Sequence, residues 1–328
     1  EALKAAHEHY QNSDRGKLVM ACGTGKTFTS LKMVEQELSG KGLVLFLVPS
    51  IALLGQSLND WMADAAYPIK AICICSDSRA SRKIKRNNDD DESDNSIVDL
   101  ALPASTNTSF ITKQLIAYQI HDGITVVFST YQSIDIVAEA QAAILKDTNG
   151  EFGVFDFIVC DEAHRTTGVK ISTKDESDFT KIHSNEFIQG KKRLYMTATP
   201  RLYGESAKIK ASKNDCILCS MDDETIYGKE FYRVNFSYAV QNGILTDYKV
   251  LVLTVSEDMI PEKLMERVKD RHVKELNYDD TGRLIGVING LSKKILGDKG
   301  ITWDADPRLM RRAIAFTHKI GRINEPGT

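Results

Sequence analysis

Short apolar runs alternate along this sequence with segments whose apolar residues recur at helical spacing, and this alternation limits the fold more than any other feature. The runs LVLFLV (43–48) and FDFIVC (155–160) contain little polar alternation, which is typical of strands covered on both faces. We therefore predict an α/β fold in which a parallel sheet carries helices on both faces. The expected strands are 17–21, 43–48, 71–75, 124–129, 155–160 and 193–196.

The composition is that of an ordinary globular protein. The chain has 328 residues, of which 42% are hydrophobic and 27% charged, with a formal net charge of -3; this length allows two domains. The longest apolar run is far shorter than the ~20 residues that span a bilayer, so we expect no membrane partner. Six cysteines are too sparse for a disulfide scaffold, and a cytoplasmic location is expected. A near-neutral charge neither requires nor excludes nucleic acid.

We predict a first domain at 1–245 and the truncated start of a second at 246–328, with a helical insertion at about 257–300. Residues of about 76–109 interrupt the first domain with a basic run, RASRKIKR, followed by a cluster of acidic residues. We interpret this segment as a mobile surface loop; contact of its basic half with a phosphate backbone is the alternative. Because the chain begins at Glu1 without a methionine, we interpret it as a fragment of a larger protein.

A glycine-rich loop, CGTGKT (22–27), joins the first predicted strand to a helix predicted at 27–38. Strand, glycine loop, GKT and helix in this order are the context of a phosphate-binding loop. The generic pattern would place a further glycine where Met20 stands, which weakens the match. The alternative is a chance glycine-rich turn, which the second motif described below argues against.

Each residue type in this loop suits a magnesium-bound triphosphate. Gly23, Thr24 and Gly25 are expected to turn backbone N–H groups inward around phosphate oxygens, and the helix N-terminus adds its partial positive charge. Lys26 would neutralise the β and γ phosphates, and Thr27 would offer its hydroxyl to Mg²⁺. ATP and Mg²⁺ are therefore the expected cofactors.

An acidic motif, Asp-Glu-Ala-His (161–164), follows the strand predicted at 155–160. Asp161 is expected to hold Mg²⁺, mostly through water, and Glu162 to polarise the attacking water in phosphoryl transfer. His164 is expected to link the nucleotide site to neighbouring segments. The alternatives are a solvated acidic turn and a histidine that is only structural.

In order and spacing these motifs resemble those of superfamily 2 helicases and translocases, since GTGKT and DEAH are followed by Thr197-Ala198-Thr199. Three further segments resemble motifs Ia, Ib and IV of that superfamily: 47–50 with Leu53 and Gln56, 129–133, and 313–318. The resemblance implies a RecA-like ATPase domain followed by the start of a second RecA-like domain.

A narrower resemblance is carried by the segments DEAHRTTG (161–168), RLYMTATPRLY (193–203), MDDE with YG (221–228) and GILTDYKVLVL (243–253). They are similar to the motor of Type I-like restriction enzymes, and most similar to Type ISP single-polypeptide restriction-modification enzymes. In that family one chain joins a nuclease, this motor, an adenine methyltransferase and a target recognition domain. The resemblance implies an ATP-dependent motor that moves double-stranded DNA, with the other domains elsewhere in the full chain.

The same resemblance assigns coupling and DNA-binding roles. Thr197 and Thr199 would couple the nucleotide site to DNA, while Pro49, Ser50 and Thr130 would touch a phosphate backbone. Ser133 also suits sequence-independent phosphate contacts. The alternative for these small hydroxyl residues is loop capping. The adenine-recognising glutamine is expected just before Glu1 and the arginine finger past Thr328, so we expect weak nucleotide binding and poor hydrolysis by the fragment alone.

Two other functions stay open. A helicase that separates DNA or RNA strands also carries DEAH, and only the family-like flanking segments favour a duplex translocase. A nucleotide-gated clamp without catalysis is the third hypothesis, against which the intact GKT and DEAH residues argue.

Overall fold

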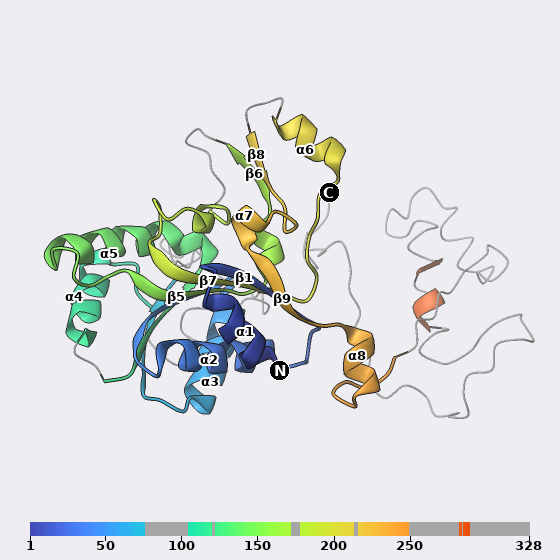
Figure 1. Cartoon of the computed structure of the whole chain (residues 1–328), viewed down its shortest axis with the longest axis horizontal. Helices are drawn as coiled ribbons and strands as arrows, with labels where there is room; N and C mark the ends of the chain where they lie inside the picture. Colours follow the sequence, from blue (N-terminus) through green and yellow to red (C-terminus); the bar gives the residue numbers. More distant parts are fainter. Residues whose placement is uncertain are drawn as a thin grey trace, which may run out of the picture. The chain divides into compact units, whose positions relative to one another are not determined.

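The computed structural model describes residues 1–75, 104–119, 122–171, 178–212 and 216–248, together with 282–283 and 285–288 (Figure 1). The chain divides into two compact units, Glu1–Asp247 and Tyr248–Thr328, and this division lies close to the boundary predicted at 245. Nearly all of the second unit lies outside the described residues. The predicted helical insertion at about 257–300 and the segment 313–318 that resembles motif IV are therefore largely or wholly outside the description, as is most of the loop at 76–109.

The first unit is built on a sheet in which every pairing is parallel, with strand order β3-β4-β2-β5-β7-β1-β9. Its strands are β1 (Arg15–Met20), β2 (Gly42–Val48), β3 (Ile69–Ile74), β4 (Ile124–Thr130), β5 (Phe155–Cys160), β7 (Gly190–Thr197) and β9 (Lys229–Val234). A separate antiparallel pair joins β6 (Gly168–Ile171) to β8 (Cys216–Cys219).

The helices of the described residues connect these strands. They are α1 (Ala2–Tyr10), α2 (Lys26–Leu38), α3 (Ile51–Asp64), α4 (Thr108–Tyr118), α5 (Ile134–Asp147), α6 (Glu205–Ser212), α7 (Glu224–Tyr227) and α8 (Phe236–Gln241). Short 3-10 turns occur at η2 (Tyr131–Ser133), η3 (Ala163–Thr166) and η4 (Lys181–His183). In the described part of the chain, no helix is both long and apolar enough to cross a bilayer.

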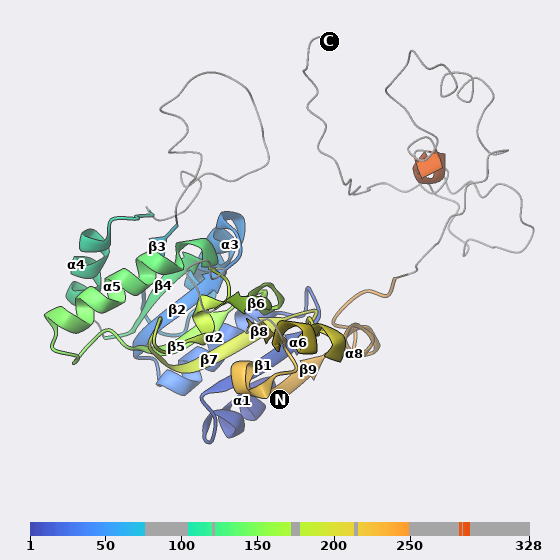
Figure 2. The same ribbon diagram turned by 90° about the horizontal axis from the view of Figure 1, so that it is seen from above.

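Both faces of the sheet are covered, as the apolar runs predict. Along β2, Val44, Phe46 and Val48 belong to the core that α1, α2 and α3 cover, whereas the intervening leucines belong to the core under α4 and α5. Successive strand residues point to opposite faces, so a strand without polar residues must be covered on both faces of the sheet. Figure 2 views the sheet from the α5 side.

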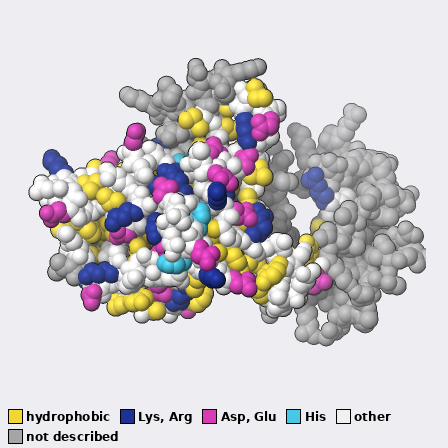
Figure 3. All heavy atoms as spheres, in the orientation of Figure 1, with side chains coloured by type: hydrophobic (Ala, Val, Ile, Leu, Met, Phe, Trp, Pro, Cys, Tyr) yellow, Lys and Arg dark blue, Asp and Glu magenta, His cyan; other side chains and the backbone are white. Residues whose placement is uncertain are grey.

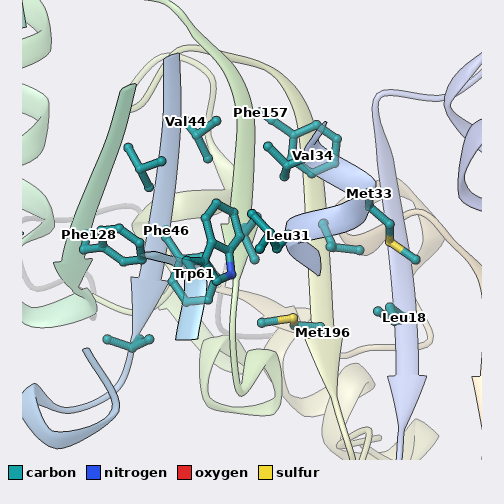
Figure 4. Close-up of a cluster of buried hydrophobic side chains, with 14 of the residues drawn as sticks. Leu18, Leu31, Met33, Val34, Val44, Phe46, Trp61, Phe128, Phe157 and Met196 are labelled. Atoms are coloured by element: carbon teal, nitrogen blue, oxygen red, sulfur yellow. The ribbon is translucent and has the colours of Figure 1, made fainter. Parts of the chain in front are cut away.

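One aromatic cluster centres on Trp61 of α3, which is fully buried (Figure 4). Its ring meets those of Phe46 and Phe128 edge to face, with centroids 5.0 and 5.8 Å apart, a geometry that aromatic pairs favour. These contacts anchor α3 against β2 and β4.

The strand predictions are confirmed within a few residues, and the end of α2 follows the expected capping chemistry. Ser39 and Gly40 take left-handed φ values of 51° and 78°, which stop the helix. The sequence reading missed β9 at the sheet edge and the β6–β8 pair. On the face seen in Figure 3, acidic and basic side chains are interspersed, in keeping with the near-neutral net charge.

Candidate nucleotide-binding site

The predicted motif segments of the first unit all follow the carboxyl ends of neighbouring parallel strands. Read across the sheet in the order β4, β2, β5, β7, β1, these strands end at Thr130, Val48, Cys160, Thr197 and Met20. Ligands of open α/β sheets gather at this edge. The glycine loop, the acidic turn and Thr197 occupy one half of the edge, and the two segments predicted to touch DNA occupy the other.

The glycine loop leaves the start of α2 available to an anion. Gly23 and Gly25 have φ values of 80° and 88°, a region that glycine adopts without strain. Gly25 is the N-cap of α2 and provides no side-chain cap, whereas Ser50 caps α3. The uncapped first-turn N–H groups and the helix dipole favour phosphate. Thr24 donates its hydroxyl to the Ala21 carbonyl at 2.7 Å and so fixes the loop from within.

Asp161 holds a buried carboxylate at the end of β5, with 6% of its surface exposed. Burial, and next the charge of Glu162, raise the pKa of the Asp161 carboxyl to about 6, whereas a hydrogen bond from the Glu162 N–H and the charge of Lys26 lower it. The glycine loop follows β1 and the acidic turn follows β5, and both strands flank β7 in the parallel sheet, so the two motifs lie at the same edge. A desolvated carboxylate beside a second acid favours a bound cation.

Glu162 occupies a left-handed backbone conformation, with φ 47° and ψ 46°. A non-glycine residue in this region costs on the order of 1 kcal/mol and such outliers cluster at functional sites. Glu162 stands two residues after the end of β5, so its backbone conformation sets the direction in which its side chain leaves the sheet.

His164 bridges the acidic turn to the end of β7. Its Nδ1 lies 3.0 Å from Thr197 Oγ1 and 3.3 Å from Glu162 Oε2. Thr197 Oγ1 also accepts the Thr199 N–H at 3.1 Å. Burial is the main cause that lowers the pKa of His164, which favours the neutral ring near pH 7. The structure thus brings together His164, Thr197 and Thr199, the residues to which the sequence assigned linking and coupling roles.

The TTG of the DEAHRTTG segment has a structural explanation. Thr166 donates its hydroxyl to the Ala163 carbonyl and Thr167 donates to the His164 carbonyl, both at 2.7 Å. The Tyr227 hydroxyl, from the predicted YG segment, donates to the Thr166 carbonyl at 2.9 Å. Side-chain hydroxyls therefore donate to three carbonyls of the short η3 turn, and two segments that carry the Type ISP resemblance meet behind the acidic turn.

The residues predicted to touch DNA lie at the ends of β2 and β4, but only one is exposed. Ser50 is exposed and caps α3, accepting the Leu53 N–H at 3.4 Å. Pro49 is buried. The hydroxyls of Thr130 and Ser133 lie 3.2 Å apart, and both residues are buried. The capping interpretation thus holds for Ser50, whereas Thr130 and Ser133 make no side-chain cap at the helical segments that they precede. Contact of these residues with DNA stays a prediction.

Sequence reasoning missed further residues that position the site. The Trp61 indole donates to the Thr27 carbonyl at 3.2 Å and ties the first turn of α2 to the core. Tyr131 donates its hydroxyl to the Asp161 carbonyl at 2.8 Å. Arg201 lies near enough to His164 to lower its pKa. Trp61 and Tyr131 are aromatic residues in apolar segments, so the sequence signals only burial and not a partner.

The residues present fit ATP–Mg²⁺. An uncapped helix start with Lys26 suits phosphate, and the Thr27 hydroxyl and Asp161 carboxylate are the oxygen ligands that Mg²⁺ prefers. The described residues contain no cluster of three or more His, Cys, Asp or Glu side chains arranged as a metal site. A metal held here would therefore take its remaining ligands from phosphate oxygens and water, as Mg²⁺ commonly does.

Known proteins resemble this chain in sequence and in fold. The family model of the Type III restriction enzyme res subunit matches residues 1–202. A curated relative, probable helicase A859L of African swine fever virus (isolate Tick/Malawi/Lil 20-1/1983), is 28% identical over 250 residues, which cover 76% of this chain and 23% of the relative.

Two solved structures of Type ISP restriction-modification enzymes are also similar. LlaBIII bound to DNA is 42% identical with a TM-score of 0.73, covering 93% of this chain and 19% of that chain. A nuclease-deletion mutant of LlaGI in complex with a DNA substrate mimic is 41% identical with a TM-score of 0.56, covering 76% of this chain and 18% of that chain. The chain thus spans about a fifth of the length of these proteins.

The matches confirm the resemblance to Type ISP enzymes and the RecA-like fold that it implied. The predicted motifs, the parallel sheet and the family model lead to the same assignment. This chain belongs to the family of the Type III restriction enzyme res subunit and carries its helicase-family ATPase domain.

Proposed function

We propose that this chain binds and hydrolyses ATP with Mg²⁺ and uses the cycle to move along double-stranded DNA within a restriction-modification enzyme. The observation that carries the proposal is that Lys26, Asp161 and the His164–Thr197 pair lie at the carboxyl ends of the neighbouring strands β1, β5 and β7. Phosphoryl transfer requires positioning and charge compensation more than covalent chemistry, and this edge supplies both.

The site residues divide the task of hydrolysis. Bound ATP–Mg²⁺ supplies the γ-phosphoryl group and a cation that offsets its charge. The α2 N-terminus and Lys26 bind the phosphates, while Thr27 and Asp161 hold the cation. Glu162 orients and polarises the attacking water. His164 contacts both Glu162 and Thr197, so a movement of Glu162 that accompanies a change in nucleotide state is transmitted to the end of β7.

The DNA part of the proposal rests on family likeness and on the position of two segments. LlaBIII, whose structure is bound to DNA, matches 93% of this chain. The segments after β2 and β4 share the sheet edge with the acidic turn, and Ser50, the N-cap of α3, is exposed there. Sequence-independent grip needs contacts with phosphates rather than bases. Nuclease, methyltransferase and target-recognition domains in the full-length chain are part of this proposal.

A first experiment tests hydrolysis in the full-length protein. Lys26→Ala should abolish ATP turnover and weaken ATP binding, because the phosphates lose the positive charge of the lysine side chain. Glu162→Gln should abolish turnover while ATP still binds, because the phosphate cradle is intact. Turnover that survives in Glu162→Gln would contradict the assigned role, and ATP binding without turnover in the wild type would support the clamp hypothesis.

A second experiment identifies the polymer. ATPase activity is measured with double-stranded DNA, single-stranded DNA and RNA, together with triplex-displacement and strand-separation assays. Stimulation by duplex DNA and triplex displacement without strand separation are the expected results. The viral relatives named as probable helicases favour the second candidate, a strand-separating helicase. Strand separation, or stimulation by RNA alone, would favour that candidate and contradict the translocase proposal.

A further inference from the structure

The hydroxyl of Tyr131 reaches the acidic turn from the opposite half of the site edge. Tyr131 directly follows β4, in the segment predicted to touch DNA, yet its hydroxyl donates to the carbonyl of Asp161 after β5 at 2.8 Å. In the sheet, β2 lies between β4 and β5. Because neighbouring strands lie about 4.8 Å apart, the side chain and its hydrogen bond together bridge two strand spacings, from β4 past β2 to β5.

This bond fixes the backbone of the proposed magnesium ligand on its second side. The Asp161 N–H already donates to the Leu47 carbonyl of β2 at 2.9 Å. The Asp161 carbonyl belongs to the peptide that leads into Glu162, whose backbone is left-handed. Rotation of that peptide would redirect the Glu162 side chain and the Asp161 carboxylate together. The Tyr131 hydroxyl therefore holds the peptide bond whose orientation sets both acids.

Tyr131 is built to act as a rigid donor. Its side chain is fully buried, and its ring stacks on Phe179 with centroids 5.1 Å apart. A tyrosine hydroxyl carries its proton at neutral pH, so it remains a donor. A fixed ring and a permanent donor transmit displacement of the η2 backbone to the acceptor carbonyl instead of absorbing it.

The neighbouring residue faces the other way. Gln132 is exposed, and its amide donates to the Pro49 carbonyl at 3.2 Å. One turn of η2 thus joins an exposed residue, tied to the segment after β2, to a buried residue tied to the acidic turn. A phosphate backbone pressing on this exposed side would move both neighbours as one piece.

We propose that Tyr131 is a positioning residue through which the segment at 129–133 reports DNA contact to the Asp161–Glu162 peptide. The inference rests on the proposed DNA-stimulated hydrolysis and adds the route by which DNA reaches the acids. Tyr131 does not touch the nucleotide in this scheme; it acts through the Asp161 carbonyl.

The test removes the hydroxyl group of Tyr131. In the full-length protein, Tyr131→Phe keeps the ring and its stacking but removes the donor. We expect the kcat of duplex-stimulated ATP hydrolysis to fall about tenfold, the effect of losing one buried hydrogen bond. The KM for ATP and the affinity for DNA should change less than about twofold, since neither binding surface is altered.

Tyr10→Phe is the matched control. Tyr10 is also a buried tyrosine whose hydroxyl donates to a backbone carbonyl, that of Arg193, at 2.9 Å, but Arg193 lies away from the site edge. Tyr10→Phe should cost similar thermal stability and leave the stimulated kcat unchanged. Equal loss of kcat in both variants, or wild-type kcat in Tyr131→Phe, would overturn the inference.

A second measurement does not depend on turnover. Hydrogen exchange of a peptide covering 161–164 should change on addition of duplex DNA in the wild type and in Tyr10→Phe, and should change much less in Tyr131→Phe. An equal DNA-induced change in all three would overturn the inference while the translocase proposal stands. A wild-type protein whose ATPase does not respond to duplex DNA would overturn both.

Discussion

Replacing Asp161 with asparagine should make the nucleotide-free protein more stable and inactive. The Asp161 pKa is raised from 3.8 to about 6, mainly by burial, and each tenfold change in acid dissociation is worth ~1.4 kcal/mol. Carrying the charge in the folded state therefore costs about 3 kcal/mol near pH 7.5. Asparagine removes the charge and keeps an oxygen that can accept the Glu162 N–H, now 2.9 Å from Asp161 Oδ1.

The pH dependence of unfolding provides a second test of the predicted stabilisation by Asp161→Asn. Because the folded-state pKa is raised, the carboxyl's contribution to stability is fully present below pH 3.8 and is lost as pH rises through about 6. The advantage of Asp161→Asn in urea unfolding should thus fall to about half by pH 5. Asp122→Asn, at a side chain that is 98% exposed, should shift stability by less than about 0.5 kcal/mol at either pH.

The reasoning would be refuted by an Asp161→Asn variant that is less stable than the wild type at pH 7.5, or by a gain that is the same at both pH values. Either result would mean that burial of the Asp161 charge does not lower the stability of the folded protein. Unfolding is measured with EDTA and without nucleotide, because a bound cation would neutralise the charge and hide the effect.

Three further substitutions test ATP binding, DNA binding and core packing separately. Trp61→Phe loses the indole donor to the Thr27 carbonyl and should raise the KM for ATP about fivefold; an unchanged KM in steady-state assays would show that this bond does not position the loop. Ser50→Asp retains a side-chain acceptor for the Leu53 N–H but should weaken DNA binding and its salt dependence, whereas Ser50→Asn should not. Leu31→Ala, at a fully buried site, should cost 2–5 kcal/mol in urea unfolding, as buried leucine truncations do.

The parts of the fold that could be predicted are those with a local signal. The apolar run of β2 requires burial on both faces, and the glycine loop before α2 requires backbone conformations that Gly23 and Gly25 supply. These signals gave the parallel sheet and the nucleotide-binding edge. The order of motifs along the chain then gave the family resemblance.

The parts that could not be predicted depend on which strands become neighbours. The Tyr131–Asp161 bond joins residues 30 positions apart, and it follows from the order β4-β2-β5, which no local pattern encodes. Likewise, β9 is an edge strand whose residues are mostly exposed or half-buried, so it lacks the apolar run by which its central neighbours were found.

The predicted DNA contacts show the same limit at the scale of single side chains. Small hydroxyl residues suit phosphate contacts and loop capping equally well. The bond between Thr130 and Ser133 depends on the η2 turn that follows β4, and the residue types alone do not indicate it. Ser50, which begins a longer helix, is the residue whose exposure agrees with the predicted role.

The convergence of the glycine loop and the acidic turn on a single metal–triphosphate can be measured with Mn²⁺ in place of Mg²⁺. Free Mn²⁺ is followed by electron paramagnetic resonance while ATP is added to the full-length protein. We predict ATP-dependent uptake of Mn²⁺ by the wild type and by Glu162→Gln, and its loss in Lys26→Ala and in Asp161→Asn alike. Uptake that persists at the wild-type level in either of the last two variants would contradict a shared site.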